Sequence, residues 1–161
     1  MTPNERILAS AHAIMRGALN APASSGLCLA LTRIIIENAF SWPSHYWYLH
    51  YVTDWVQPPG YDRSRGHWAR DAERSLRRLG MNVHVSERKP GDLVFNWRSA
   101  WSNEYGAFIG HVGVLVDGDM ILENINPSFR AGRAFSRGAT SLTPFGAWER
   151  VTLVARFVPE Q

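Results

Sequence analysis

Hydrophobic residues follow a helical period in the first half of the chain. Apolar positions recur three or four residues apart in residues 4–19, which predicts an amphipathic helix. PASSG (22–26) then predicts a turn and a serine N-cap, and LCLALTRIIIENAF (27–40) predicts an apolar helix. HWARDAERSLRRLG (67–80) indicates a further amphipathic helix, which Gly80 closes at the expected C-terminal cap. Three helices are therefore predicted within residues 4–80.

The period changes to two from residue 81 onward. This alternation predicts five strands, at NVHVSE (82–87), GDLVFNW (91–97), HVGVLVDG (111–118), MILENI (120–125) and VTLVARFV (151–158). DGD (117–119) predicts the tight turn of a hairpin. Helices that precede an antiparallel sheet are typical of the α+β class. The fold expected is therefore N-terminal helices packed on an antiparallel sheet of about five strands, in a single domain over residues 1–161.

Two segments show no such period. Residues 41–66 are dense in Trp, Tyr and His and interrupted by Pro and Gly, which predicts loops with a short helix between them. We expect their aromatic side chains to cover the core, with sugar or peptide binding as the alternative. Residues 126–146 are rich in Gly, Ser and Arg and predict a long loop near the functional site.

Composition narrows the possible partners. A net charge of +3 favours an acidic partner, but the arginines are scattered and no nucleic-acid-binding motif accompanies them, so no nucleic-acid partner is expected. No apolar run approaches the roughly 20 residues of a membrane-spanning helix, so no membrane partner is expected either. The mixed charges of the N-terminus do not resemble a signal peptide, and we expect a monomer that is cytoplasmic when made.

Cysteine usage directs attention to one residue. Cys28 is the single cysteine of the chain, so an intrachain disulfide and the Cys/His spacing of a zinc site are both absent. No acidic run resembles a calcium loop, and neither a metal nor another cofactor is expected. Cys28 falls in the first turn of the predicted 27–40 helix, where the positive end of the helix dipole lowers the pKa of a thiol.

A histidine and two polar residues complete a candidate catalytic group. His111 begins a predicted strand, and an imidazole beside a thiol can hold its proton if a third polar group orients the ring. The following strand carries Glu123 and Asn124. We expect a two-residue Asp117-Gly118 turn to place Asn124 beside His111 and a three-residue turn to place Glu123 there. The sequence leaves both alternatives open.

The order of these motifs resembles a known family. LCLALTR, KPGDLVFNW, GHVGVLVDGDMILEN and a closing ARFVP are similar to papain-like peptidoglycan peptidases and amidases of the NlpC type and the related CHAP type, best over residues 89–124. The resemblance implies a papain-like fold with Cys28 as the nucleophile and His111 as the base. It favours Glu123 as the third residue, with Asn124 as the alternative.

The resemblance also implies an activity. The expected function is peptidoglycan hydrolysis by a cysteine endopeptidase or N-acetylmuramoyl-L-alanine amidase, as in a phage lysin, a tail-associated hydrolase or an antibacterial effector. Bacterial peptidoglycan would be the partner, reached after release from the cell or on a virion. Two alternatives are a thiol acyltransferase and a catalytically inactive papain-like module with a structural or binding role.

Overall fold

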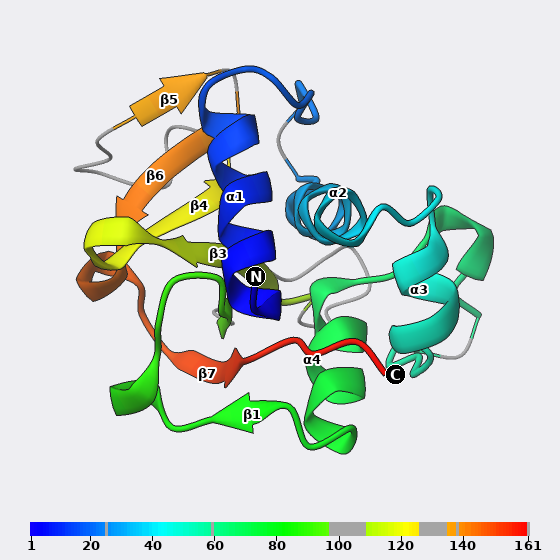
Figure 1. Ribbon diagram of the computed structural model, residues 1–161. Coiled ribbons are helices and arrows are strands. Elements are labelled where there is room, and N and C mark those ends of the chain that lie inside the picture. The colour runs from blue at the N-terminus through cyan, green and yellow to red at the C-terminus, as the bar shows by residue number, and fades with distance from the viewer. Residues whose placement is uncertain (25, 59, 97–108, 126–134, 138, 161) are drawn as a thin grey trace.

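The helices and strands form an α+β structure (Figure 1). The computed structural model describes residues 1–24, 26–58, 60–96, 109–125, 135–137 and 139–160. The α-helices within these residues are α1 (Pro3–Met15), α2 (Cys28–Phe40), α3 (Tyr46–Tyr51) and α4 (Ala69–Arg78). Helices α1 and α2 lie side by side and pack on the central strands of the sheet, whereas α4 packs on the strand nearest the C-terminus. The predicted α+β class is confirmed.

The described strands form one antiparallel sheet. They are β1 (Asn82–Val83), β2 (Leu93–Asn96), β3 (His111–Val116), β4 (Met120–Asn124), β5 (Phe135–Arg137), β6 (Thr140–Pro144) and β7 (Val151–Ala155). Their order across the sheet is β1-β7-β2-β3-β4-β6-β5. Strand β3, which begins with His111, is therefore central and has strands on both sides.

The prediction of a long loop over residues 126–146 is wrong for its second part. Strands β5 and β6 lie within it, and β6 pairs with β4 along its whole length. Strand β6 reads TSLTP, and its buried Thr and Ser side chains hide the alternation that a strand normally shows. The remainder of the predicted loop, residues 126–134 and 138, falls outside the described residues.

Two helix boundaries differ from the prediction. Helix α1 ends at Met15 instead of near Asn20, as its pattern predicts, because Gly17 adopts a positive φ of 78° and the N–H of Ala18 bonds back to the carbonyl of Ala13. The serine N-cap predicted for α2 is also wrong. Its N-cap residue is Leu27, whose side chain makes no capping hydrogen bond.

Two other local predictions are confirmed and a third is corrected. Helix α3 is the short helix expected within residues 41–66. Helix α4 ends at the expected place, with Gly80 just beyond it at a φ of 75°. The segment predicted as a strand over 82–87 is shorter, because the N–H of Ser86 bonds to Nδ1 of His84 and the chain turns into a 3-10 helix over Val85–Glu87.

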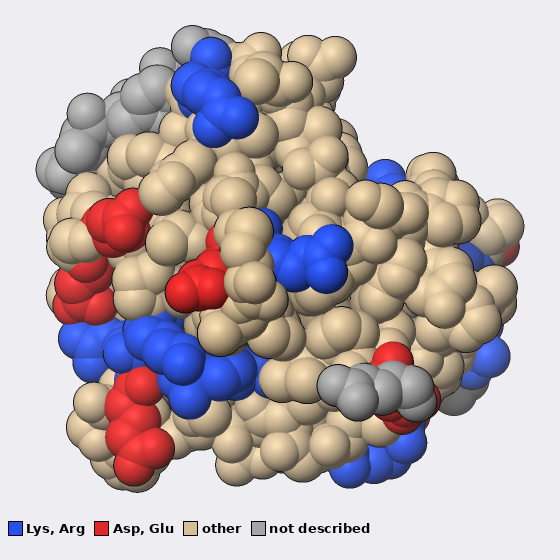
Figure 2. Space-filling view, viewed as in Figure 1, with Lys and Arg blue, Asp and Glu red and all other residues tan. Residues whose placement is uncertain are grey.

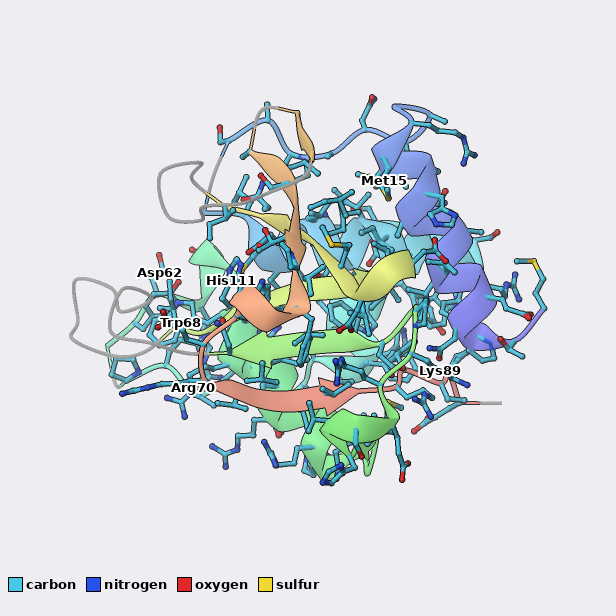
Figure 3. The ribbon with its side chains drawn as sticks, turned by 90° about the vertical axis from the view of Figure 1, so that its left-hand side faces the viewer. Met15, Asp62, Trp68, Arg70, Lys89 and His111 are labelled. Carbon is cyan, nitrogen blue, oxygen red and sulfur yellow. The ribbon has the colours of Figure 1, made fainter. Side chains whose placement is uncertain are left out.

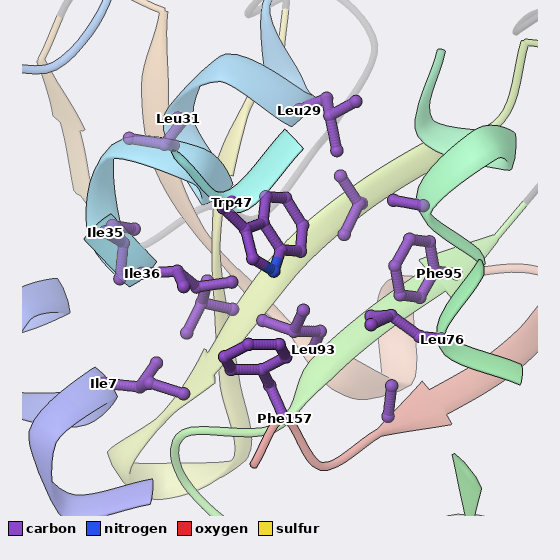
Figure 4. Close-up of a cluster of buried hydrophobic side chains, with 14 of the residues drawn as sticks. Ile7, Leu29, Leu31, Ile35, Ile36, Trp47, Leu76, Leu93, Phe95 and Phe157 are labelled. Carbon is purple, nitrogen blue, oxygen red and sulfur yellow. The ribbon is translucent and has the colours of Figure 1, made fainter. Parts of the chain in front are cut away.

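The core lies between the helices and one face of the sheet (Figure 4). Its largest fully buried side chains include Ile7, Ile35, Trp47, Leu93 and Phe157, contributed by helices, sheet and the C-terminal segment. A smaller cluster of Val94, Leu115, Ile121 and Trp148 covers the opposite face. Both faces of β2 and β3 are thus buried, which explains why these strands read as nearly continuous apolar runs.

The surface carries both signs of charge. On the face shown in Figure 2, a short band of adjoining Lys and Arg side chains has Asp and Glu side chains above and below it, and other basic side chains lie apart from it. Arg88 pairs with Asp119 at 2.7 Å, and Arg156 pairs with the buried Asp92 at 2.9 Å. Among the described residues, no helix has the length and apolar character needed to cross a membrane.

Candidate active site

The fold brings the two candidate catalytic residues together at one end of the sheet. Cys28 is the first residue of α2, His111 is the first residue of β3, and α2 packs on β3. Figure 3 shows His111 at the same end of the molecule as Trp68 and Arg70, and away from Met15 and Lys89. The N-terminus of a helix and the beginning of a strand therefore form the site.

The Cys28 thiol and the His111 imidazole are hydrogen-bonded and electrostatically coupled. Burial alone would raise the pKa of the thiol, but the charge of His111 and its hydrogen bond outweigh burial and lower the pKa below its ordinary value. Burial likewise disfavours the imidazolium, yet the neighbouring thiolate and Glu123 raise the pKa of His111 to about 9. The lowered pKa of the thiol and the raised pKa of the imidazole both favour the thiolate and imidazolium form of the pair.

Backbone groups also stabilise the thiolate. The N–H groups of Val112 and Leu29 both donate to the Cys28 sulfur and lower its pKa. Because no side chain caps the start of α2, the positive end of the helix dipole also acts on this sulfur. The prediction of Cys28 in the first turn of a helix is confirmed.

Glu123 lies on the other side of the imidazole. Its Oε1 is 2.8 Å from Nε2 of His111, which leaves Nδ1 as the ring nitrogen that faces the thiol. Its Oε2 accepts a hydrogen bond of 3.2 Å from the indole Nε1 of Trp148. The carboxylate is fully buried, and the Trp148 ring packs against the imidazole with 5.1 Å between centroids. Glu123 and Trp148 thus fix the orientation of His111.

The strand register explains how Glu123 reaches the imidazole. The turn over Asp117–Asp119 has three residues and pairs Val116 with Met120 and Gly113 with Glu123. Continued to His111, this register puts Ile125 directly opposite, so the expectation that a three-residue turn sets Glu123 opposite His111 is wrong. Glu123 is instead the diagonal neighbour on the same face, and it reaches the imidazole across Gly113.

Gly113 makes this diagonal contact possible. A Cβ at this position would lie 2.4 Å from Cγ2 of Ile121 and 2.9 Å from the backbone oxygen of Leu122. We expect Gly113→Ala to lower the free energy of unfolding by about 2 kcal/mol, because β3 and β4 must separate to admit the methyl group. Urea unfolding measures this effect. Gly146→Ala is the control, since a Cβ there meets no atom within 4 Å, and equal stability of the two variants would contradict the explanation.

Asn124 lies on the opposite face of β4 from Glu123 and does not contact His111 among the described residues. Its Oδ1 accepts a hydrogen bond of 2.9 Å from the backbone N–H of Leu27, and its Nδ2 donates to the backbone oxygen of Ser24 at 2.9 Å. The side chain is 1% exposed. Asn124 therefore holds the segment that leads into Cys28, and it satisfies a backbone N–H at a helix start that lacks a side-chain cap.

This contact predicts an effect on the nucleophile. We expect Asn124→Ala to destabilise the fold by about 1 to 2 kcal/mol, because a buried side chain loses two part-buried hydrogen bonds. We also expect Cys28 to be alkylated more slowly at pH 7, because the start of α2 is no longer fixed. Iodoacetamide labelling measures the rate, and Asn82→Ala on the exposed edge strand β1 is the control. An unchanged labelling rate would reduce Asn124 to a packing role.

A pocket of about 340 Å³ opens beside the sulfur. It lies where the start of α2, the start of α3, the start of α4 and the residues before β3 meet. The described residues that line it are Gly26, Leu27, Cys28, Leu29, Ala30, Arg33, His45, Tyr48, Ser64, Gly66, His67, Trp68, Ala69, Ile109 and Gly110. Cys28 is partly exposed to this pocket, whereas His111 is buried behind it.

A second hollow of about 400 Å³ adjoins the first. The two share His45, Tyr48 and His67, and the second continues over Leu49 and Trp55. The aromatic residues of segment 41–66 therefore both cover the core, through Trp47, and line the cleft, through Tyr48 and Trp55. Within the described part of the chain, no group of three or more His, Cys, Asp or Glu is placed to hold a metal ion.

Sequence reasoning missed several parts of the site. Trp148 lies in a segment without a motif, and nothing in its neighbourhood indicates a contact with Glu123. Val112 directly follows His111, but the hydrogen bond from its N–H to the Cys28 sulfur could be predicted only if the distance between helix and strand were known.

No protein-family model matches this chain, and comparisons with curated proteins and with solved structures also found no match.

Proposed function

We propose that this protein is a cysteine hydrolase with a papain-like arrangement, which cleaves an amide bond of bacterial peptidoglycan. The observation that carries the proposal is the sequence of contacts from Cys28 to His111 to Glu123 beside an open pocket. A thiol hydrogen-bonded to an imidazole, which is in turn held by a buried carboxylate, is the arrangement that nucleophilic catalysis requires. The motif order in residues 89–124 supports peptidoglycan as the substrate.

The reaction would be acyl transfer to water. The Cys28 thiolate attacks the amide carbonyl, and the C–S bond forms as the carbonyl oxygen becomes an oxyanion. The backbone N–H of Cys28, at the uncapped start of α2, stabilises this charge. His111 gives its Nδ1 proton to the departing amine, and the C–N bond breaks. His111 then accepts a proton from water, which hydrolyses the thioester and restores the thiolate.

The experiment that tests this proposal compares the activity of two proteins on purified peptidoglycan. Wild type and Cys28→Ala are incubated with peptidoglycan from several bacteria, and released fragments are identified by mass spectrometry. Freed stem peptides would identify an amidase, and new amine termini within the stem would identify an endopeptidase. Release by wild type alone supports the proposal. If wild type releases nothing from any wall and a thiolate-directed probe fails to label Cys28, the hydrolase proposal is lost.

A further inference from the structure

Arg33 lies on the same helix as Cys28 and lines the same pocket. Arg33 follows Cys28 by five positions, so it stands about 7.5 Å farther along the axis of α2. Its side chain is 13% exposed, which is low for an arginine. The guanidinium is therefore held in the wall of the pocket that Cys28 also lines.

One part of the guanidinium is used within the fold. Nη1 donates to Oε1 of Glu37 at 2.6 Å and to Oγ of Ser44 at 3.2 Å. The guanidinium carbon lies 5.4 Å from the centroid of the Tyr48 ring. These contacts hold the planar group in one orientation, so its position does not have to be organised when a ligand arrives.

The guanidinium also hydrogen-bonds to the Tyr48 side chain, but one of its donors is left over. Nε of Arg33 is buried and has no hydrogen-bond partner among the described residues. A buried donor of a charged group without an acceptor is costly, so such a group in a native protein requires an explanation, and one explanation is a ligand that supplies the acceptor. The edge formed by Nε and Nη2 presents two parallel N–H directions, which match the two oxygens of a carboxylate.

The rest of the pocket suits an anion. None of its described lining residues is acidic, and its polar members besides Arg33 and Cys28 are His45, Tyr48, Ser64 and His67. Nδ1 of His45 contacts Ser44 Oγ at 2.9 Å, and Nδ1 of His67 contacts Asp71 Oδ2 at 3.3 Å. In both histidines, Nε2 is therefore the ring nitrogen available to a ligand. Burial raises the pKa of Tyr48, which keeps its hydroxyl a donor.

We propose that Arg33 and Tyr48 form a subsite for a free carboxylate of the substrate, distinct from the carbonyl that Cys28 attacks. The inference rests on the proposed hydrolase function and adds a specificity to it. The preferred substrate is an acylated amine that carries a non-reacting carboxylate close to the scissile amide. A small shift of the guanidinium lets Nε and Nη2 donate to that carboxylate, with the Tyr48 hydroxyl as a further donor.

The test uses two synthetic stem peptides that differ at one group. One has a free carboxylate on the residue next to the scissile amide, and the other has a carboxamide there. We expect wild type to cleave the carboxylate peptide with a kcat/KM about 10 to 100 times higher, since a site built for a charged group discriminates against its neutral analogue. A chromatographic assay of the released amine measures both rates.

Variants then test Arg33. Arg33→Lys keeps a positive charge beside Glu37 but lacks the planar edge, so we expect the preference to fall to about threefold or less. Arg33→Met/Glu37→Gln removes both charges, leaves no lone buried carboxylate and should abolish the preference. Arg74→Lys is the control, because its side chain is 67% exposed on α4, and we expect the wild-type preference to be kept.

Two outcomes would overturn the inference and leave the hydrolase intact. One is equal cleavage of the two peptides by wild type, and the other is full preference in folded Arg33→Lys. Failure of the proposed function itself would give a different result: wild type that is folded by circular dichroism would cleave neither the peptides nor purified walls.

Discussion

His111→Ala is expected to reduce the rate of amide hydrolysis by about 10⁴-fold or more, because the imidazole both maintains the thiolate and supplies the proton for the leaving amine. Loss of His111 also removes the main influence that lowers the pKa of Cys28. Burial remains and raises that pKa, so alkylation of the thiol at pH 7 should slow by at least about tenfold. Hydrolysis of a stem peptide and iodoacetamide labelling provide the two readouts.

The pH dependence of the wild type follows from the same pair. The active form carries a thiolate and an imidazolium. It accumulates as pH rises through the pKa of Cys28, which is lowered from 9.0, and it is lost as pH rises through the pKa of His111, about 9. We therefore expect a bell-shaped profile of kcat/KM whose alkaline limb lies near pH 9. In His111→Ala, labelling of Cys28 should instead rise only above pH 9.

An exposed histidine outside the site serves as the control for His111→Ala. His84 is exposed, and its Nδ1 bonds within its own turn to the Ser86 N–H, so His84→Ala should keep wild-type activity. The prediction is contradicted if His111→Ala is folded, as shown by circular dichroism, and labels Cys28 with an unshifted pH profile. That result would mean that the thiolate depends on the helix terminus and backbone N–H groups alone.

Replacing Glu123 is expected to have the second largest effect. Glu123→Gln keeps the shape of the side chain but removes the charge that helps to raise the pKa of His111. The alkaline limb of the profile should therefore move to lower pH, and kcat should fall by about 10 to 100-fold as the imidazolium is less stabilised. Steady-state kinetics across roughly pH 5 to 10 measure both changes, because this range includes the pKa of His111, about 9.

Glu123→Ala adds a stability effect. The substitution removes the acceptor for Nε2 of His111 and for Nε1 of Trp148, both in a buried setting. We expect the free energy of unfolding to fall by about 3 kcal/mol, the usual consequence of breaking a buried charged pair. Urea unfolding at pH 7 gives the value. A kcat unchanged in Glu123→Gln would show that the negative charge of Glu123 is not needed and that a neutral acceptor and Trp148 packing suffice to orient the imidazole.

The proposed carboxylate subsite and the catalytic pair share one helix. Cys28 and Arg33 both lie on α2, and Asn124 ties the segment before Cys28 to β4. Because α2 carries both groups as one rigid element, the distance between the attacked carbonyl and the second carboxylate is set by the helix. Substrate choice is therefore expected to depend on the spacing between these two groups of the substrate more than on its remaining residues.

Local chemistry explains what the sequence by itself determined. Periods of 3.6 and two located α2, α4 and the central strands, because burial of one face imposes those spacings wherever the chain is regular. The position of Cys28 at the start of a helix and of His111 at the start of a strand followed from the same patterns. Strand β6 was not predicted because polar Thr and Ser side chains occupy its buried positions.

Only the tertiary structure decided how these pieces meet. Glu123 and Asn124 are neighbours in sequence, yet the pleat sends one to His111 and the other to the segment before Cys28. The choice depends on a three-residue turn and on the space above Gly113, which are properties of paired strands and not of either strand alone. Trp148 and Arg33 likewise acquire their roles through contacts with segments distant in sequence or through a pocket that several elements enclose.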